Sequence, residues 1–129
     1  MCRIKFLKNR RRKSKIISCN GNNLNYGDYG LKSLSWGRLT KNQIESGRKV
    51  ITRHIRGSGK IWIRIHPDTS FTKKPIDTRM GNGKGEILYY YFFVKPGKII
   101  YEISGLSKIN SLNVLKLASF KLPLKTIII

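Results

Sequence analysis

The residues best suited to chemistry lie in one short stretch, Thr78-Arg79-Met80-Gly81-Asn82-Gly83-Lys84-Gly85-Glu86. Its three glycines occupy alternate positions, and glycine lets a backbone adopt positive φ angles and approach another molecule closely. An arginine and a lysine add two cations to the same loop. The stretch therefore predicts a loop that contacts an anionic partner.

Two nucleotide-binding motifs are similar to this loop, but one differs from it in residue type and the other in spacing. A Walker A loop needs Ser or Thr after its Gly-Lys pair to bind magnesium, whereas Gly85 follows Lys84 here. The glycines also miss the last interval of the GxGxxG fingerprint. Pro75 makes the preceding segment a poor Rossmann strand. These differences argue against a nucleotide cofactor, although a nucleotide-dependent enzyme remains an alternative to test.

No other constellation indicates catalysis or metal binding. Two cysteines 17 residues apart do not make a disulfide framework, and they fit a reducing compartment. Cys2, Cys19, His54 and His66 lack the CxxC or HxxxH spacing of a zinc site. The six acidic residues are scattered and form no close motif with Ser or His: Asp28, Glu45, Asp68, Asp77, Glu86 and Glu102. We therefore expect no enzyme, no metal and no cofactor.

The charge balance points to a polyanionic partner. The chain of 129 residues carries 27 Lys+Arg against 6 Asp+Glu, a net charge of +21. Such self-repulsion in a free protein favours a permanent association with nucleic acid, or secondly with an anionic membrane. No apolar run approaches the ~20 residues of a membrane span. No signal-peptide segment follows the basic start, so we expect a mature, unexported chain.

The scaffold for the loop begins with a basic arm. Residues 3–15 contain eight cations, Arg10, Arg11, Arg12 and Lys13 among them. A segment this basic has little to bury and cannot fold alone. We interpret it as an arm that lies along phosphates, the alternative being a merely solvated tail.

The clearest helix is expected over residues 40–56. Thr40 and Gln43 have capping-box spacing, and Gly57 marks the end. The buried stripe is predicted to be Ile44, Gly47, Ile51 and Ile55. The opposite flank holds four cations and a threonine without balancing acids, and at least two of its residues are expected to contact RNA: Arg48, Lys49, Thr52, Arg53 and Arg56.

Strands are expected at residues 31–39, 60–66, 87–94, 98–104 and 125–129. The third is rich in aromatic and β-branched residues and predicts a buried strand; the turn at 96–97 would join it to the fourth as a hairpin. Residues 68–77 are expected to be irregular. After a connector at 105–111, a short helix would run from Leu112 to Leu122 and end before Pro123.

Residues 60–66 alternate cleanly between two faces. Three isoleucines take one face, while the other combines Trp62 with Lys60, Arg64 and His66. An aromatic among cations suits base stacking. For Trp62 we favour packing in a second hydrophobic layer, with the cations at its rim. The order of elements predicts an α+β protein, a mixed sandwich with two helices over one sheet face.

Several short blocks agree in order and spacing with one family. They include Gly37-Arg38-Leu39-Thr40, Gly59-Lys60-Ile61-Trp62-Ile63-Arg64, Arg79-Met80-Gly81, Gly83-Lys84-Gly85, Pro96-Gly97-Lys98 and Lys121-Leu122-Pro123-Leu124-Lys125-Thr126. Over about residues 24–126 the chain resembles the large ribosomal subunit protein L-sixteen family of bacterial type. We accordingly divide the chain into a basic rRNA-binding arm, residues 1–23, and one globular α+β domain, residues 24–129.

The resemblance implies an α/β-hammerhead fold with a long Gly-rich loop and a structural role in the large ribosomal subunit. Such a protein binds large-subunit rRNA beside the peptidyl transferase centre, helps form the A-site tRNA region and touches neighbouring ribosomal proteins. No membrane and no homo-oligomer is expected. The loop near the tRNA acceptor end would be Arg79, Met80, Gly81, Asn82, Gly83, Lys84 and Gly85. The rRNA-binding residues would be Arg10, Arg11, Arg12, Lys13, Arg38, Arg48, Arg53, Arg56, Lys60 and Arg64.

Departures from the family bear on origin. Asn82 stands where the family usually has Lys, and the start Met1-Cys2-Arg3-Ile4 is unusual. The 18 isoleucines, 17 lysines and 9 asparagines against one alanine indicate an AT-rich genome. We therefore expect a protein of the mitochondrial matrix, with a plastid or the cytoplasm of a reduced AT-rich bacterium as alternatives. The rival function is a free RNA-binding module or RNA chaperone outside the ribosome.

Overall fold

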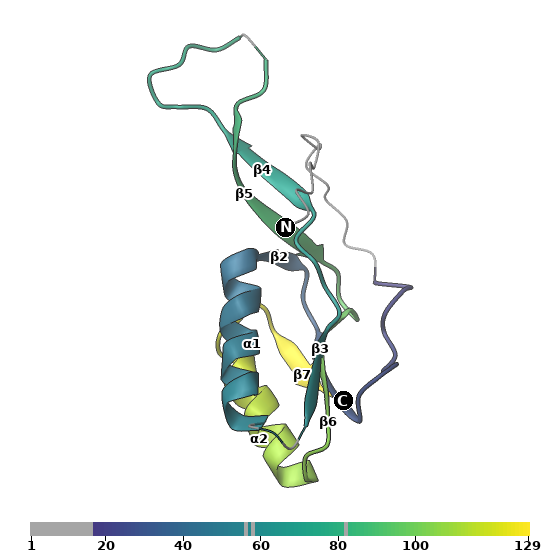
Figure 1. The fold of residues 1–129 in the computed structure, drawn as a ribbon. Coiled ribbons are helices and arrows are strands. Elements are labelled where there is room, and N and C mark those ends of the chain that lie inside the picture. The colour runs from purple at the N-terminus through teal and green to yellow at the C-terminus, as the bar shows by residue number, and fades with distance from the viewer. Residues whose placement is uncertain (1–16, 56, 58, 82) are drawn as a thin grey trace.

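Two helices and seven strands form the described part of the chain, an α+β fold as the sequence predicts (Figure 1). A computed structural model describes residues 17–55, 57, 59–81 and 83–129. The helices are α1 (Lys41–Ile55) and α2 (Lys108–Ser119). The strands are β1 (Tyr29–Ser33), β2 (Gly37–Thr40), β3 (Lys60–Ile63), β4 (Thr69–Lys73), β5 (Glu86–Val94), β6 (Ile99–Ser104) and β7 (Thr126–Ile128).

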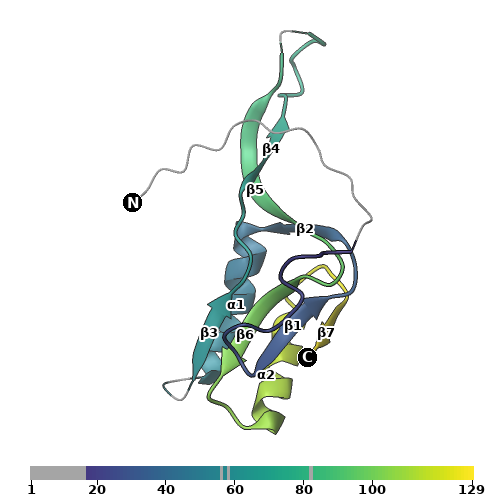
Figure 2. The ribbon, with the colours of Figure 1, turned by 90° about the vertical axis from the view of Figure 1, so that its right-hand side faces the viewer.

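The main core lies between the helices and a four-stranded antiparallel sheet. Its strand order is β3-β6-β1-β7, and both helices cover one face (Figures 1 and 2). β6 is one of the two central strands, and its first five residues are buried. The buried cluster unites this strand with both helices and includes Leu31, Ile51, Ile100, Ile103 and Leu115. Burying this apolar surface supplies the main stabilisation of the fold.

The helix α1 begins and ends as the sequence predicts. The backbone N–H of Thr40 donates to Gln43 Oε1 at 3.0 Å, and the Gln43 N–H donates to Thr40 Oγ1 at 3.4 Å. These two bonds satisfy donors that a helix start otherwise leaves unpaired. The predicted stripe is buried in full: Ile44, Gly47, Ile51 and Ile55. Gly57 has φ +83°, the left-handed conformation expected after a helix end.

The second sheet is a long ribbon that projects from this body. Its strand order is β2-β5-β4, and β4 and β5 extend away from the helices, with the glycine loop joining their far ends (Figure 2). The prediction of a buried strand over residues 87–94 is correct only for its second half. Leu88 is 62% exposed, whereas Tyr91 and Val94 are buried.

Two strand predictions are wrong because the chain changes sheets, and a third segment contains a strand that was not predicted. Residues 31–39 form β1 and β2 in different sheets, and the exposed Leu34 and Trp36 lie in the crossing segment. The turn at 96–97 is real, but it carries the chain from the second sheet into the first, so β5 and β6 do not pair. Residues 68–77 are not wholly irregular, since β4 pairs with β5 and Pro75 lies beyond its end.

Two elements also differ from expectation in their bounds. β3 ends at Ile63, which is 40% exposed, while Ile65 is buried beyond the strand. α2 begins at Lys108 rather than Leu112 and ends at Ser119 rather than Leu122, and the extended Ser107 (φ −61°, ψ 151°) precedes it. In the first turn of α2, the apolar Ile109 is 73% exposed and the polar Ser111 is buried. This is the reverse of an amphipathic helix, in which apolar residues face the core.

Candidate nucleic-acid interface

The glycine loop occupies the far end of the β4–β5 ribbon. Gly81 has φ +110° and Gly83 has φ +80°, so both use the freedom that glycine provides. A Cβ built at either position would meet nothing within 4 Å, and the Met80 side chain is fully exposed. Asn82 lies outside the described residues. The loop tip thus projects from the body, as an element that reaches another molecule would.

The base of the loop is narrow. A Cβ at Gly85 would lie 2.6 Å from the carbonyl carbon and oxygen of Lys73, so the two backbones approach too closely for a side chain. Lys74 Nζ donates to the carbonyl oxygen of Gly81 across the loop. The exposed Arg79 and Lys84 add charge near the tip. Close backbone packing at the base therefore fixes where these cations project.

The α1 flank is cationic but not free of acids. Glu45 accepts from Arg48 Nη2 at 2.6 Å and from Nε at 2.9 Å, so one member of the flank has an acidic partner. The hydrogen bond from Arg48 lowers the pKa of Glu45, and the pair raises the pKa of Arg48. Arg53 and Lys49 are exposed on the same helix, and Lys60 is exposed at the start of β3. Arg56 and the arm cations Arg10, Arg11, Arg12 and Lys13 lie outside the described residues.

Arg38 belongs to an aromatic cluster on the ribbon. Its guanidinium carbon lies 5.4 Å from the ring centroid of Tyr91, a cation–π distance. Phe71 stacks on Tyr89 with ring centroids 4.8 Å apart, and both rings lie edge-on to Tyr91. The cluster connects β2, β4 and β5, so it stiffens the part of the ribbon that leaves the body.

Arg64 has internal partners. It donates to the fully buried carboxylate of Glu102, and its guanidinium carbon lies 5.2 Å from the Tyr26 ring centroid. Tyr26 in turn stacks on Trp62 with centroids 6.1 Å apart. Trp62 thus packs against one ring that is itself 63% exposed, and a second hydrophobic layer around it remains a prediction. Contact between Arg64 and RNA remains a prediction, and its guanidinium already has a structural role.

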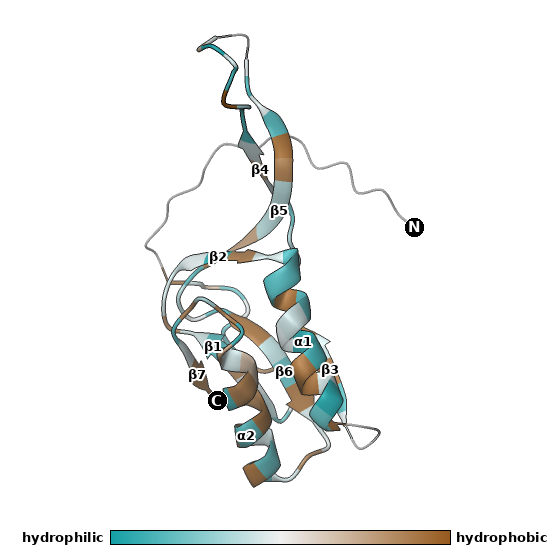
Figure 3. Ribbon diagram, turned by 90° about the vertical axis from the view of Figure 1, so that its left-hand side faces the viewer, coloured by the Kyte–Doolittle hydropathy of each residue, from teal (hydrophilic) through white to brown (hydrophobic). Residues whose placement is uncertain are grey.

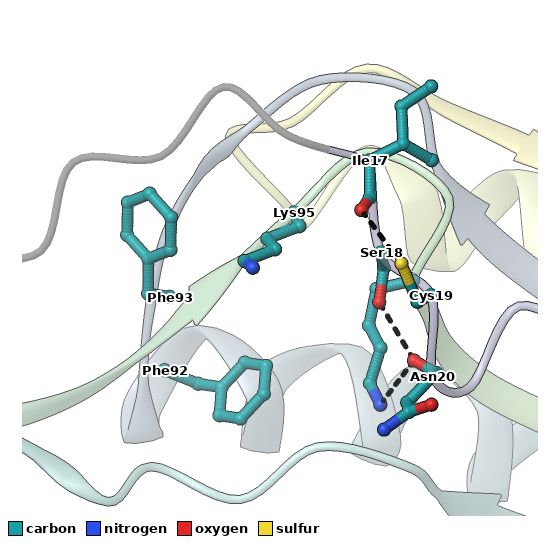
Figure 4. Close-up of a pocket in the computed structure, with 8 residues that line it drawn as sticks. Ile17, Ser18, Cys19, Asn20, Phe92, Phe93 and Lys95 are labelled. Carbon is teal, nitrogen blue, oxygen red and sulfur yellow. Dashed lines mark hydrogen bonds between the residues drawn. The ribbon is translucent and has the colours of Figure 1, made fainter.

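Sequence reasoning missed an open cleft beside the start of the described chain (Figure 4). The cleft has a volume of about 310 Å³ and is lined by Ile17, Ser18, Cys19, Asn20, Phe92, Phe93, Lys95 and Lys98. Lys98 Nζ donates to the Asn20 carbonyl at 3.1 Å, and burial together with the charge of Arg64 lowers the pKa of Lys98. In the sequence, the two phenylalanines and two lysines within residues 92–98 were the only pattern that could have indicated this cleft.

Residues 18–21 contact the body through their backbone. The Ser18 N–H donates to the Pro96 carbonyl at 2.8 Å, and Ile99 donates to the Gly21 carbonyl at 2.9 Å. The described residues 18–21, which belong to the predicted arm, therefore lie at the β5–β6 turn. The division of the chain at residue 23 remains a prediction.

Within the described ranges, no three His, Cys, Asp or Glu side chains gather where they could hold a metal ion. The described helices are also too short or too polar to cross a membrane. The candidate interface therefore consists of the cations on the loop, the ribbon and the α1 flank.

A family model described as "Ribosomal protein L16p/L10e" matches residues 1–129. The chain belongs to this family. It is 48% identical over 127 residues to large ribosomal subunit protein uL16 of Buchnera aphidicola subsp. Cinara cedri (strain Cc), covering 98% of this chain and 93% of that protein. It is 54% identical over 109 residues to uL16 of Buchnera aphidicola subsp. Baizongia pistaciae (strain Bp), covering 84% and 80% respectively.

These comparisons confirm the family that the sequence blocks indicate. Both relatives are bacterial, so they support the bacterial alternative and give no support to the mitochondrial origin that we expected. The unusual start and the abundance of isoleucine, lysine and asparagine are therefore no guide to an organelle. An AT-rich genome alters composition in the same way wherever it occurs.

Proposed function

We propose that this chain is a structural constituent of a bacterial large ribosomal subunit, where it binds large-subunit rRNA and helps form the A-site tRNA region. Membership of the L16p/L10e family supports the ribosomal role, which is structural and not enzymatic. The placement of the glycine loop at the end of a projecting ribbon is the observation that supports the second part (Figure 1).

The ribbon provides reach. The nine-residue strand β5, at about 3.3 Å per residue, spans about 30 Å from its buried end to the loop. Its first four residues are exposed, so this half of the strand is available to other molecules of the particle. A loop so far from the core can enter an RNA-lined region while the body stays outside it.

Charge provides the attachment. Arg38 on the ribbon and Arg53 and Lys60 on the body present cations from three different elements, and the arm would add Arg10 to Lys13. Each phosphate contact releases condensed counterions, so binding should weaken steeply with salt. In this mechanism no bond is made or broken: the body and arm dock on rRNA, and Arg79 and Lys84 contact RNA near the tRNA acceptor end.

Sedimentation tests the ribosomal part. The chain, expressed with a small tag in a bacterium, should travel with large subunits through a gradient at moderate salt. A free RNA chaperone would stay near the top, and that result would refute the proposal. A nucleotide-dependent enzyme would show a raised melting temperature when saturated with ATP or GTP, which we do not expect.

The loop is tested in the assembled subunit. Subunits carrying Arg79→Ala with Lys84→Ala should retain the chain yet bind A-site tRNA less tightly. Lys49→Ala, an exposed cation on α1, serves as the control and should leave tRNA binding unchanged. Equal tRNA affinity in the loop variant and the wild type would remove the loop from the A-site region.

A further inference from the structure

The helix α2 is apolar on two opposite sides. Its inner side buries Val114, Leu115 and Ala118 against α1 and the sheet. Its outer side exposes four large apolar side chains, hereafter the α2 outer face: Ile109 (73% exposed), Leu112 (38%), Leu117 (42%) and Phe120 (72%). At about 100° per residue, these four lie within one sector of about 140° around the helix axis, and the exposed Asn113 and Lys116 lie in the same sector.

This pattern differs from that of the neighbouring helix. α1 follows the usual amphipathic pattern, with buried apolar residues on one side and polar or charged residues on the other. In Figure 3, brown apolar bands and teal polar bands alternate along both helices. α2 also exposes Lys108, Asn110, Asn113 and Lys116, so it is not apolar all round. Large apolar side chains that gather on one exposed face nonetheless mark an interaction surface.

The surroundings of the α2 outer face carry charge of one sign. Residues 103–129 contain Lys108, Lys116, Lys121 and Lys125 and no Asp or Glu. Lys108 and Lys116 lie on α2 itself, and Lys121 follows its end; all three are exposed. A partner that covers the face would gain from carboxylates at its rim, where they would meet these ammonium groups.

We propose that the α2 outer face binds a second protein of the same particle, through an apolar surface on that protein bordered by Asp or Glu. This inference rests on the proposed function, which supplies the particle. It names the surface that makes the contact and the chemistry of the partner's side, which neither family membership nor the glycine loop specifies.

RNA is a poor occupant of this face. Proteins hold RNA through cations on phosphates and through aromatic or guanidinium planes on bases. Three of the four exposed apolar side chains are aliphatic, and the face holds no arginine. A second copy of the chain is also a poor occupant, because each copy carries a net charge of +21 and the two would repel.

The small size of the face fits a partner held on the same scaffold. Four side chains bury less apolar surface than the roughly 600 Å² or more per partner of a stable independent complex. Two proteins bound to one rRNA meet at an effective concentration that can reach about 1 mM, at which a weak contact is occupied. The contact should therefore form in the assembled subunit.

Photo-crosslinking in assembled subunits tests the proposal. Phe120 is replaced by benzoylphenylalanine, an aromatic residue of similar shape, and salt-washed large subunits are irradiated. The expected product joins this chain to another subunit protein, at a peptide that contains apolar residues and at least one Asp or Glu. The same probe at Arg53 on α1 should yield rRNA crosslinks. Crosslinks from position 120 to rRNA, to a second copy or to nothing would overturn the docking site.

A matched pair of variants tests the energetics. In the chain that carries the probe at position 120, Ile109→Ser with Leu117→Ser should lower the crosslink yield to the partner by on the order of tenfold. Ile76→Ser, which removes a 93% exposed side chain from the glycine-loop end of the ribbon, should leave that yield unchanged. An unchanged crosslink yield in the α2 variant would overturn the proposal. A wild-type chain missing from large subunits would instead overturn the proposed function beneath it.

Discussion

Arg64 and Glu102 form an ion pair that joins three separate segments of the chain. The carboxylate of Glu102, on a central strand (β6), is fully buried and accepts from Arg64 just after β3. Its other oxygen accepts the backbone N–H groups of Asn25, Tyr26 and Gly27 at 3.3, 2.8 and 3.1 Å. The pair therefore fastens the segment that follows the arm to the middle of the sheet.

The first prediction concerns acid stability. Burial raises the pKa of Glu102, but the three backbone N–H donors and Arg64 outweigh burial, so its pKa lies below the usual value. The stabilisation is present above the unfolded carboxyl pKa of about 4.3 and is lost as pH falls through the folded pKa. Glu102→Gln should remove this component and cost about 2 kcal/mol at pH 7, because its NH₂ must face another donor.

Urea denaturation between pH 3 and pH 7 measures both effects. The wild type should lose stability as the pH falls below about 4.3, and Glu102→Gln should show a flatter profile there. Glu45→Gln is the control, since Glu45 pairs with Arg48 on the exposed side of α1 and solvent screens that pair. Parallel acid profiles for Glu102→Gln and the wild type would contradict the assignment.

The second prediction separates a structural arginine from an RNA-binding one. Arg64→Ala leaves the Glu102 carboxylate buried without its cation and should destabilise the fold by on the order of 3 kcal/mol. Arg53→Ala, on the exposed flank of α1, should leave stability near that of the wild type. Binding of Arg53→Ala to an rRNA fragment should weaken, with the slope of log K against log salt smaller by roughly 0.7 to 0.9.

Melting curves measure the stability of the two variants, and salt titrations of rRNA binding measure their contribution to the interface. Arg53→Ala with an unchanged salt slope would remove Arg53 from the interface. Arg64→Ala with wild-type stability would show that the ion pair contributes nothing to folding. The sequence places both arginines in the same predicted set of rRNA-binding residues. The buried Glu102 beside Arg64 is what distinguishes a structural arginine from an exposed one.

Local patterns predicted α1 and its buried stripe, because a capping box and an apolar repeat act within a few residues. They failed for β5 and β6, since the Pro96-Gly97 turn is compatible with either a hairpin or a change of sheet. The choice depends on which partners the strands find: β5 pairs with β2 and β4, and β6 with β1 and β3. Arg64 and Glu102 lie 38 residues apart, a separation that no local pattern can connect.

The third prediction concerns Gly47, which lies in the buried stripe of α1 under Tyr101. A Cβ at Gly47 would lie 2.4 Å from the Tyr101 hydroxyl oxygen, and that hydroxyl donates to the Ile44 carbonyl at 2.7 Å. Ala is favoured over Gly in a helix by about 1 kcal/mol, yet this overlap should make Gly47→Ala destabilising by about 1 to 3 kcal/mol.

A double-mutant cycle with Tyr101→Phe checks the cause. Removing the hydroxyl relieves the closest overlap, so the double variant should lose less stability than the sum of the two single variants. Asn42→Ala, an exposed position on the same helix, controls for helix propensity. Additive losses would mean that Gly47 is needed for a reason other than the proximity of Tyr101.

The fourth prediction distinguishes two glycines of the loop. Gly81 has φ +110° and open space around it, so Gly81→Ala strains the loop alone and should leave the melting temperature of the body unchanged. Gly85→Ala places a methyl group 2.6 Å from the Lys73 backbone and should force apart the ends of β4 and β5. Its effect on amide hydrogen exchange should be strongest at Thr72 and Lys73 and fade toward Tyr91, where β2 also supports the ribbon. Equal exchange in both variants would show that the base of the loop is open rather than closely packed.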